Sequence, residues 1–237
     1  MRVLGIDLAA SPATTAIARL DGLTVTAVEV GVDDDRIVEL AAGAAKIGID
    51  CPLGWPRAFV DFVAAHQAGR PTSAADTVAA RRPLAYRATD LWVAAHHPPL
   101  RPLSVSADRI GHAAMRAAGL LARLGETDRS GTARVVEVYP AASLRQWGMP
   151  FRGYKGPDGA ALRSASVSAL ASVLELGPHA DLCRACDHAL DAVVAAASAR
   201  AVELGRASGP DTTQREVATV EGWIAIPTGE LAGLREG

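Results

Sequence analysis

Apolar positions along the chain fall partly in short continuous runs and partly at helical spacing, a pattern typical of proteins that mix strands with helices. The first 50 residues predict five elements in the order β-β-β-α-β, at residues 1–9, 13–20, 23–30, 33–45 and 46–50. Asp21-Gly22 separates the second run from the third and favours a hairpin turn. The first and last strands both read Gly-Ile-Asp at their ends, with Asp7 and Asp50, so we expect them to deliver two aspartates to one edge of a sheet.

The rest of the chain alternates between helical segments, loops and one further strong strand. Helices are predicted at 57–69 and 107–125, a proline-rich loop at 96–104, a strand at 133–142, a turn-rich loop at 151–159, and then two helices, the second at 181–204. Residues 221–227 are compatible with a final short strand. We therefore expect one α/β domain over residues 1–237, with a mixed five-stranded sheet flanked by helices and a largely helical insertion at residues 57–130.

Length and composition favour a water-soluble, intracellular protein. The chain has 237 residues, of which 49% are hydrophobic, enough for a sizeable core. No uninterrupted apolar run approaches the roughly 20 residues of a membrane span, and the first residues enter a strand without the pattern of a signal peptide. Three cysteines indicate a reducing compartment. We expect a cytoplasmic protein with no membrane partner; its oligomeric state is open.

Acidic residues stand at the ends of the apolar elements. Asp7, Asp50 and Glu137 end or lie in apolar strands, and Asp187 and Asp191 share one face of an apolar helix. Any one of them alone is typical of a helix cap or a solvated helix face. Together they ask for another explanation, because several are flanked by residues that favour burial and a lone buried carboxylate is costly.

A divalent cation would explain why carboxylates gather. Mg²⁺ and Mn²⁺ prefer oxygen ligands, and two ions about 3.5–4 Å apart are a common device for in-line phosphoryl displacement. In that arrangement we expect each Gly-Ile-Asp segment to contribute one carboxylate to a shared metal site.

Positive charge concentrates in the middle of the chain. The net charge is −2, yet residues 79–134 hold nine arginines and four acids. Arg109, Arg116 and Arg123 recur every seven residues and share a helix face, which is either a solvated surface or a phosphate-contacting one. Aromatic residues make up only 4% of the chain, so the sequence does not support single-strand binding by base stacking.

The order of elements resembles the ribonuclease H fold. More narrowly, the chain resembles the family catalogued as domain of unknown function 429, predicted ribonuclease H-like nucleases. The resemblance lies in motifs that follow the family's order over nearly the whole chain: GIDLA, IGIDCPLGWP, YRATD, VVEVYPAA, YKG, ALDAVVAAASA and EGWIAIP. It implies a nuclease that uses Mg²⁺ or Mn²⁺ and acts on nucleic acid, with the type of nucleic acid left open.

By motif, the resemblance implies a set of catalytic, metal-binding carboxylates: Asp7, Asp50, Glu137 and Asp191, with Asp187 as a further metal ligand. The helix motif here reads Asp-His-Ala-Leu-Asp, so His188 is an alternative ligand and the fourth ligand is open. Arg87 and Asp90 of YRATD and Lys155 of YKG fall in family motifs without an assigned role. We predict that these three contact substrate, together with Arg109 and Arg116.

Two other functions compete with a nuclease. An actin-like small-molecule kinase has the same sheet topology, and residues 5–21 are similar to its first phosphate loop. The chain is short for two such domains, however, and it lacks a later Asp-x-Gly loop and a Gly-Gly adenosine motif. A non-catalytic module that binds nucleic acid or protein on the ribonuclease H-like fold is the other alternative.

The cysteines raise the possibility of a zinc site. Cys183 and Cys186 form a CxxC pair, with His179 and His188 nearby. A structural zinc site normally needs four ligands at compatible spacing, and the chain has only one such pair, so we favour buried thiols. Cys51, next to Asp50, is assigned to packing.

Overall fold

A computed structural model describes residues 1–70 and 75–236. Its centre is a mixed sheet that has six strands in these residues, in the order β3-β2-β1-β4-β5-β6. The strands are β1 (Arg2–Asp7), β2 (Ala16–Asp21), β3 (Thr24–Val30), β4 (Lys46–Asp50), β5 (Val135–Val138) and β6 (Ile224–Ala225). Neighbours are antiparallel from β3 to β1 and parallel from β1 to β6.

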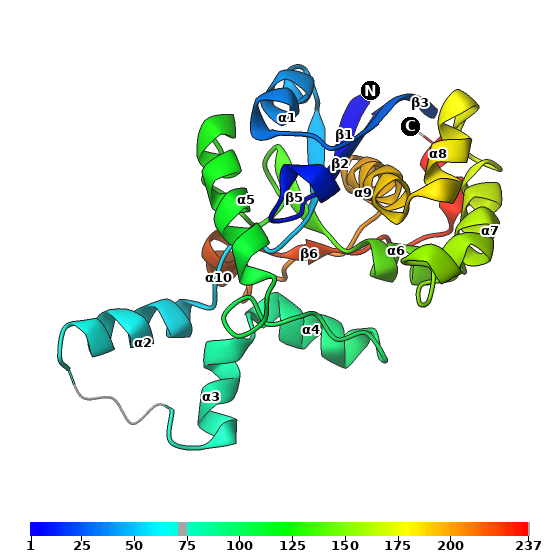
Figure 1. Cartoon of the computed structure of the whole chain (residues 1–237). Helices are drawn as coiled ribbons and strands as arrows, with labels where there is room; N and C mark the ends of the chain where they lie inside the picture. The colour runs from blue at the N-terminus through cyan, green and yellow to red at the C-terminus, as the bar shows by residue number, and fades with distance from the viewer. Residues whose placement is uncertain (71–74, 237) are drawn as a thin grey trace.

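Helices cover both faces of this sheet (Figure 1). The α-helices of the described residues are α1 (Asp34–Ala41), α2 (Arg57–Gln67), α3 (Val78–Ala85), α4 (Ala88–His96), α5 (Gly111–Leu124), α6 (Pro140–Gln146), α7 (Ala160–Leu170), α8 (Ala180–Ala185), α9 (Asp187–Glu203) and α10 (Arg215–Glu221). No helix in the described ranges combines the length and the apolar character that crossing a membrane requires.

The predicted order β-β-β-α-β is confirmed, and the expected α/β fold with a mixed sheet is present. The hairpin forms where Asp21-Gly22 predicts it, with Gly22 at φ +61° between β2 and β3. The sheet has one strand more than expected: Ile224–Ala225, within the segment 221–227 that is compatible with a short strand, pairs in parallel with β5. The expected sheet of five strands is therefore corrected to six.

The helix predicted over residues 181–204 is two helices. Cys186 has φ −126° and ψ 120°, which is extended backbone, and it separates α8 from α9. Helix α9 begins directly after this break, at Asp187. The chain therefore turns sharply before it enters the most buried helix of the protein.

The predicted insertion, residues 57–130, contains α2 to α5, and its residues 71–74 lie outside the described part. Helices α2 and α3 extend away from the sheet at one side of the molecule (Figure 1). Helix α5 belongs to the core, because its apolar face packs with α1 against β1 and β4. The basic segment is thus partly an extension and partly a layer of the fold itself.

Strand β1 divides its side chains between two cores. Leu4 and Ile6 belong to the cluster formed with α1 and α5, and Val3 belongs to the cluster formed with α7 and α9. Alternate residues of a strand point to opposite faces, so Gly5 and Asp7 lie on the α9 face with Val3. Two-faced burial explains why the strand reads as a continuous apolar run.

Glycine lets α9 approach the sheet closely. A Cβ on Gly5 would lie 2.1 Å from the backbone nitrogen of Ala196 and 2.2 Å from the carbonyl oxygen of Ala192. Gly48, paired with Gly5 across β1 and β4, would place its Cβ 2.7 Å from the carbonyl oxygen of Ala195. Helix α9 therefore rests on a stripe of the sheet that has no side chains.

We predict that Gly5→Ala destabilises the protein by more than about 3 kcal/mol, because the added methyl group meets helix backbone, which cannot turn away as a side chain can. Urea unfolding followed by circular dichroism measures this change. Gly119→Ala is the matched control: Gly119 is an exposed residue of α5 with open space around it. That variant should be up to about 1 kcal/mol more stable than wild type. Equal stabilities for the two variants would contradict the close approach of α9.

Candidate metal centre

The two Gly-Ile-Asp segments place their aspartates on the same face of the sheet. Asp7 and Asp50 are level with each other in the parallel pairing of β1 with β4. Each lies two residues after the glycine that contacts α9, so each side chain emerges on the α9 side. The predicted delivery of both aspartates to one edge is confirmed.

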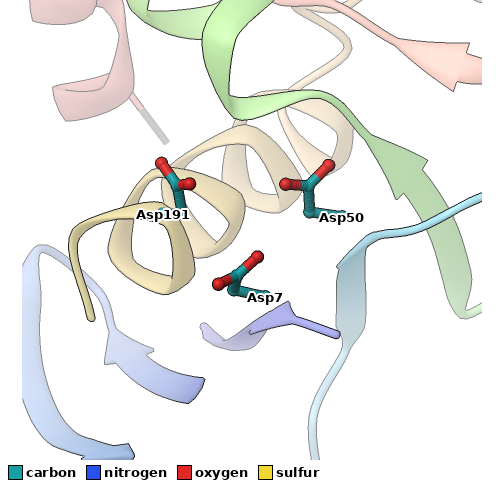
Figure 2. Close-up of side chains that lie close together, drawn as sticks. All are labelled: Asp7, Asp50 and Asp191. Carbon is teal, nitrogen blue, oxygen red and sulfur yellow. The ribbon is translucent and has the colours of Figure 1, made fainter. Parts of the chain in front are cut away.

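Asp191, which lies one turn after the start of α9, is the third carboxylate of the group. Oxygen atoms of Asp7, Asp50 and Asp191 all lie within 4.8 Å of one another. Figure 2 shows these side chains side by side, at the ends of β1 and β4 and on the helix. Asp7 and Asp191 are buried and Asp50 is partly buried, so their charges are largely removed from water.

Three neighbours contact the group. The Nζ atom of Lys155 lies 2.7 Å from Oδ2 of Asp191, and the hydroxyl of Tyr154 donates to Oδ1 of the same residue at 2.8 Å. His188 places Nδ1 2.6 Å from Oδ2 of Asp7. Tyr154 is not among the predicted site residues. Its position in the YKG motif, next to Lys155, is the only feature of the sequence that indicates its role.

Burial and neighbouring charges oppose the ionisation of Asp50 and Asp191. Burial raises the pKa of Asp50 well above its ordinary value, and the charge of Asp7 raises it further. Burial also raises the pKa of Asp191 to about 6, although Lys155 acts in the opposite direction. The hydrogen bond with Asp7 raises the pKa of His188. One ammonium group and one imidazole therefore leave the three carboxylates short of positive charge.

The donor set suits a hard cation. Three convergent carboxylate oxygens are the ligands that Mg²⁺, Mn²⁺ and Ca²⁺ prefer, and a divalent ion would relieve the repulsion among them. In the described residues, no other set of three histidine, cysteine or acidic side chains comes as close together. Asp7, Asp50 and Asp191 could thus hold a metal ion.

Glu137 is not a member of this group, which corrects its predicted role as a catalytic metal ligand. In the pairing of β4 with β5 it is level with Ile49, one residue before the level of Asp50. Its neighbours Val136 and Val138 contact α9, so Glu137 points away from that helix. Both of its oxygens are bound by the guanidinium of Arg87, at 2.6 and 2.7 Å.

Arg87 and Asp90 are also corrected, from substrate contacts to parts of a buried network. Each is 1% exposed. The guanidinium of Arg87 binds both oxygens of Asp90 as well as Glu137, and the Glu137 carboxylate accepts from the amide of Leu53 at 3.0 Å. The YRATD motif therefore ties the start of α4 to the end of β5 and to the loop after β4.

Asp187 lies near the group without belonging to it. Its Oδ2 accepts from the amide of Gly156 at 2.9 Å, in the loop that bears Lys155. Partial burial opposes ionisation, but this amide and the charge of His188 hold the pKa of Asp187 below its ordinary value. Its carboxylate thus holds the lysine-bearing loop, and its role as a metal ligand stays a prediction.

Of the three arginines spaced seven residues apart, Arg116 and Arg123 lie in α5 and are paired. Arg109 lies before α5, which begins at Gly111, so the three do not share one helix face as predicted. Arg116 binds Asp34 of α1 and the carbonyl oxygen of Ala9, so its guanidinium fastens the loop after Asp7 and is not available to a substrate. Arg123 pairs with Asp35 on the surface. Arg109 is exposed, and its predicted contact with substrate stays a prediction.

The cysteines are free thiols. Cys183 is buried in α8, Cys51 is buried after β4, and Cys186 is partly buried at the helix break. The zinc alternative gains no support from the described residues, because no third ligand joins Cys183 and Cys186. Cys51 and Cys183 pack in the two large cores, and Cys186 packs against the edge of one of them.

A family model matches residues 5–215, a range that includes all three aspartates of the group; its description is protein of unknown function (DUF429). The chain belongs to this family. The resemblance noted in the motifs is thereby confirmed at the level of the family, while a nuclease activity for this DUF429 member stays a prediction. No curated protein and no solved structure matches the chain.

We predict that Asp191→Asn stabilises the metal-free protein at neutral pH. A carboxyl group whose pKa is about 6 in the fold and 3.8 otherwise binds its proton more tightly when folded. Stability is therefore highest below about pH 4 and is lost as the pH rises to about 6, by up to about 3 kcal/mol. The variant lacks this loss, so its advantage over wild type should grow between pH 4 and 6 in thermal unfolding with a chelator present.

Asp35→Asn is the control for this experiment, because the side chain of Asp35 is 87% exposed. Its difference from wild type should not change over the same range of pH. An Asp191→Asn advantage that shrinks as the pH rises would contradict the crowding of carboxylates.

Proposed function

We propose that the protein is a divalent-metal-dependent hydrolase of phosphodiester bonds, a nuclease. The observation that supports this most strongly is the group of Asp7, Asp50 and Asp191. Three carboxylates from two strands and a helix meet within 4.8 Å, although burial and the charge of Asp7 raise the pKa of both Asp50 and Asp191. Such crowding is expected where a divalent cation binds and is otherwise unfavourable.

Asp7, Asp50 and Asp191 would hold the cation, and we propose two ions, Mg²⁺ or Mn²⁺, with Asp7 between them. When bound, such a pair generates a nucleophile from water at neutral pH and stabilises both the attacking and the leaving oxygen of a phosphoryl displacement. The tight packing of α9 on Gly5 and Gly48 would keep the three ligands at fixed separations.

The neighbouring groups have supporting tasks. Tyr154 and Lys155 orient Asp191 through both of its oxygens, and His188 orients Asp7. With metal bound, the charge of Lys155 is no longer needed to balance Asp191. Its side chain is 58% exposed, so the ammonium group can turn to a phosphate of the substrate.

We predict that Asp7→Asn keeps the fold and lowers phosphodiester cleavage at least about a hundredfold, since even residues that only support a metal ligand cost 10–100-fold when changed. The assay is cleavage of RNA, DNA and RNA–DNA hybrid substrates with Mn²⁺ or Mg²⁺. Asp181→Asn, at a 93% exposed surface position, should retain the activity. If wild type and Asp7→Asn are equally inert on every substrate and neither binds metal, a non-catalytic binding module replaces the nuclease.

Metal binding should also be visible as stability. At a metal concentration of 100 times Kd, a ligand of the folded state contributes about 2.7 kcal/mol. For a chain of this size that corresponds to a rise in Tm of roughly 5–10 °C on adding Mn²⁺. We expect Asp7→Asn to lose the rise and Asp187→Asn to keep it, because Asp187 binds the Gly156 amide. If Asp187→Asn loses the rise in Tm and Asp7→Asn keeps it, the metal binds at Asp187 and not at the three aspartates.

A further inference from the structure

A pocket opens beside Asp50 that the proposed metal chemistry does not use. Its volume is about 470 Å³, and its lining includes Asp50 and Lys155, so it adjoins the carboxylate group. Pockets for small ligands and cofactors span about 300–1,000 Å³. The space therefore suits one small molecule or a single unit of a polymer, and it is too small for a duplex.

Aromatic rings are concentrated in this lining. The chain has ten phenylalanine, tyrosine and tryptophan residues (three, three and four), and three of the ten, Tyr139, Phe151 and Tyr154, line the pocket. The low aromatic content argued against base stacking, but the fold gathers these rings from two separate segments. Pro102, Leu103 and Ile110 add apolar surface from the loop before α5. This enclosure has the chemistry that binds a flat, apolar group.

Charged side chains also line the pocket. Arg87 and Glu137 form part of the lining but satisfy each other. The groups open to a ligand are Lys155 and Arg152, whose guanidinium lies 5.5 Å from the centre of the Phe151 ring. The lining thus combines aromatic rings with cations and with Asp50 of the carboxylate group. A ligand that matches both parts has a planar ring system and a phosphate.

We infer that this pocket binds one unstacked nucleoside unit, with its base among Tyr139, Phe151 and Leu103 and its phosphate toward Asp50 and Lys155. The inference rests on the proposed function, which puts the reacting phosphate at the three carboxylates. It adds that the substrate is recognised one nucleotide at a time, either as a free nucleotide or as an unpaired nucleotide of a strand. Stacking on an aromatic side chain is tolerant of sequence, so we expect little preference among bases.

Equilibrium binding of two probes in Mg²⁺ tests this inference. Adenosine 5′-monophosphate carries the base and ribose 5-phosphate lacks it, and both carry the same phosphate. We expect the nucleotide to bind at least about tenfold more tightly, because stacking of one base contributes roughly this factor or more. Equal affinities for the two probes would overturn the base pocket.

A matched pair of variants locates the effect. Phe151→Leu removes the ring in the pocket and keeps most of the apolar volume. Phe62→Leu makes the same change in α2, where the ring stacks on His66 and not in the pocket. Phe151→Leu should weaken adenosine 5′-monophosphate binding about five- to tenfold and leave ribose 5-phosphate unchanged, and Phe62→Leu should change neither. Loss of nucleotide affinity in both variants, or in neither, would overturn the assignment.

Competition identifies the source of the nucleotide. A single-stranded trinucleotide that displaces adenosine 5′-monophosphate supports an unpaired strand as substrate, and a trinucleotide that does not displace it supports a free nucleotide. Displacement by a blunt duplex alone would overturn the inference.

Cleavage assays distinguish the failure of this inference from the failure of the proposed function. A protein that cleaves with Mn²⁺ but binds both probes equally retains the proposed function without the pocket. One that prefers the nucleotide but never cleaves retains the pocket without the nuclease.

Discussion

The contact between helix α9 and the two glycines of the central strands sets the geometry of the whole site. A helix that rests directly on Gly5 and Gly48 has its height above the sheet fixed by backbone atoms. The aspartates two residues further on each strand then emerge beside the start of that helix, where Asp191 lies. One packing constraint thus brings together three charges from distant parts of the sequence.

The same constraint explains the composition of α9. A helix that is buried on all sides has no room for large side chains where it contacts the backbone of the sheet. Residues 189–199 are accordingly rich in alanine and valine. A carboxylate in such a helix is costly, and the protein surrounds Asp191 with Tyr154 and Lys155. The helix therefore combines tight packing with a group of crowded carboxylates that could hold a cation.

A second buried network supports the site from the other face of the sheet. Arg87 binds Asp90 and Glu137, and Glu221 accepts from the amides of Arg57 and Ala88. These contacts connect the helical extension, the loop after β4 and the chain before β6. A fully buried ion pair is sensitive to the loss of one partner, so this network fixes how the extension meets the pocket.

Much of this arrangement could be predicted from local patterns. Two strands ending in Gly-Ile-Asp, the hairpin at Asp21-Gly22 and the acids of α9 all have signals within a few residues. The errors arose where the outcome depends on register or on distant partners. Glu137 was assigned to the site because it ends an apolar strand, but a shift of one residue relative to Asp50 turns it to the opposite face. Arg116 finds its partners on α1 and in the loop after β1, which spacing along α5 cannot reveal.

The most direct test of the account is anomalous diffraction from crystals of the wild-type protein grown with Mn²⁺. The account predicts an anomalous peak among the carboxylates of Asp7, Asp50 and Asp191, and its absence from crystals of Asp7→Asn grown in the same way. A peak at Asp187 or Glu137, or no peak near the three aspartates at a saturating Mn²⁺ concentration, would contradict the metal centre on which the proposed function depends.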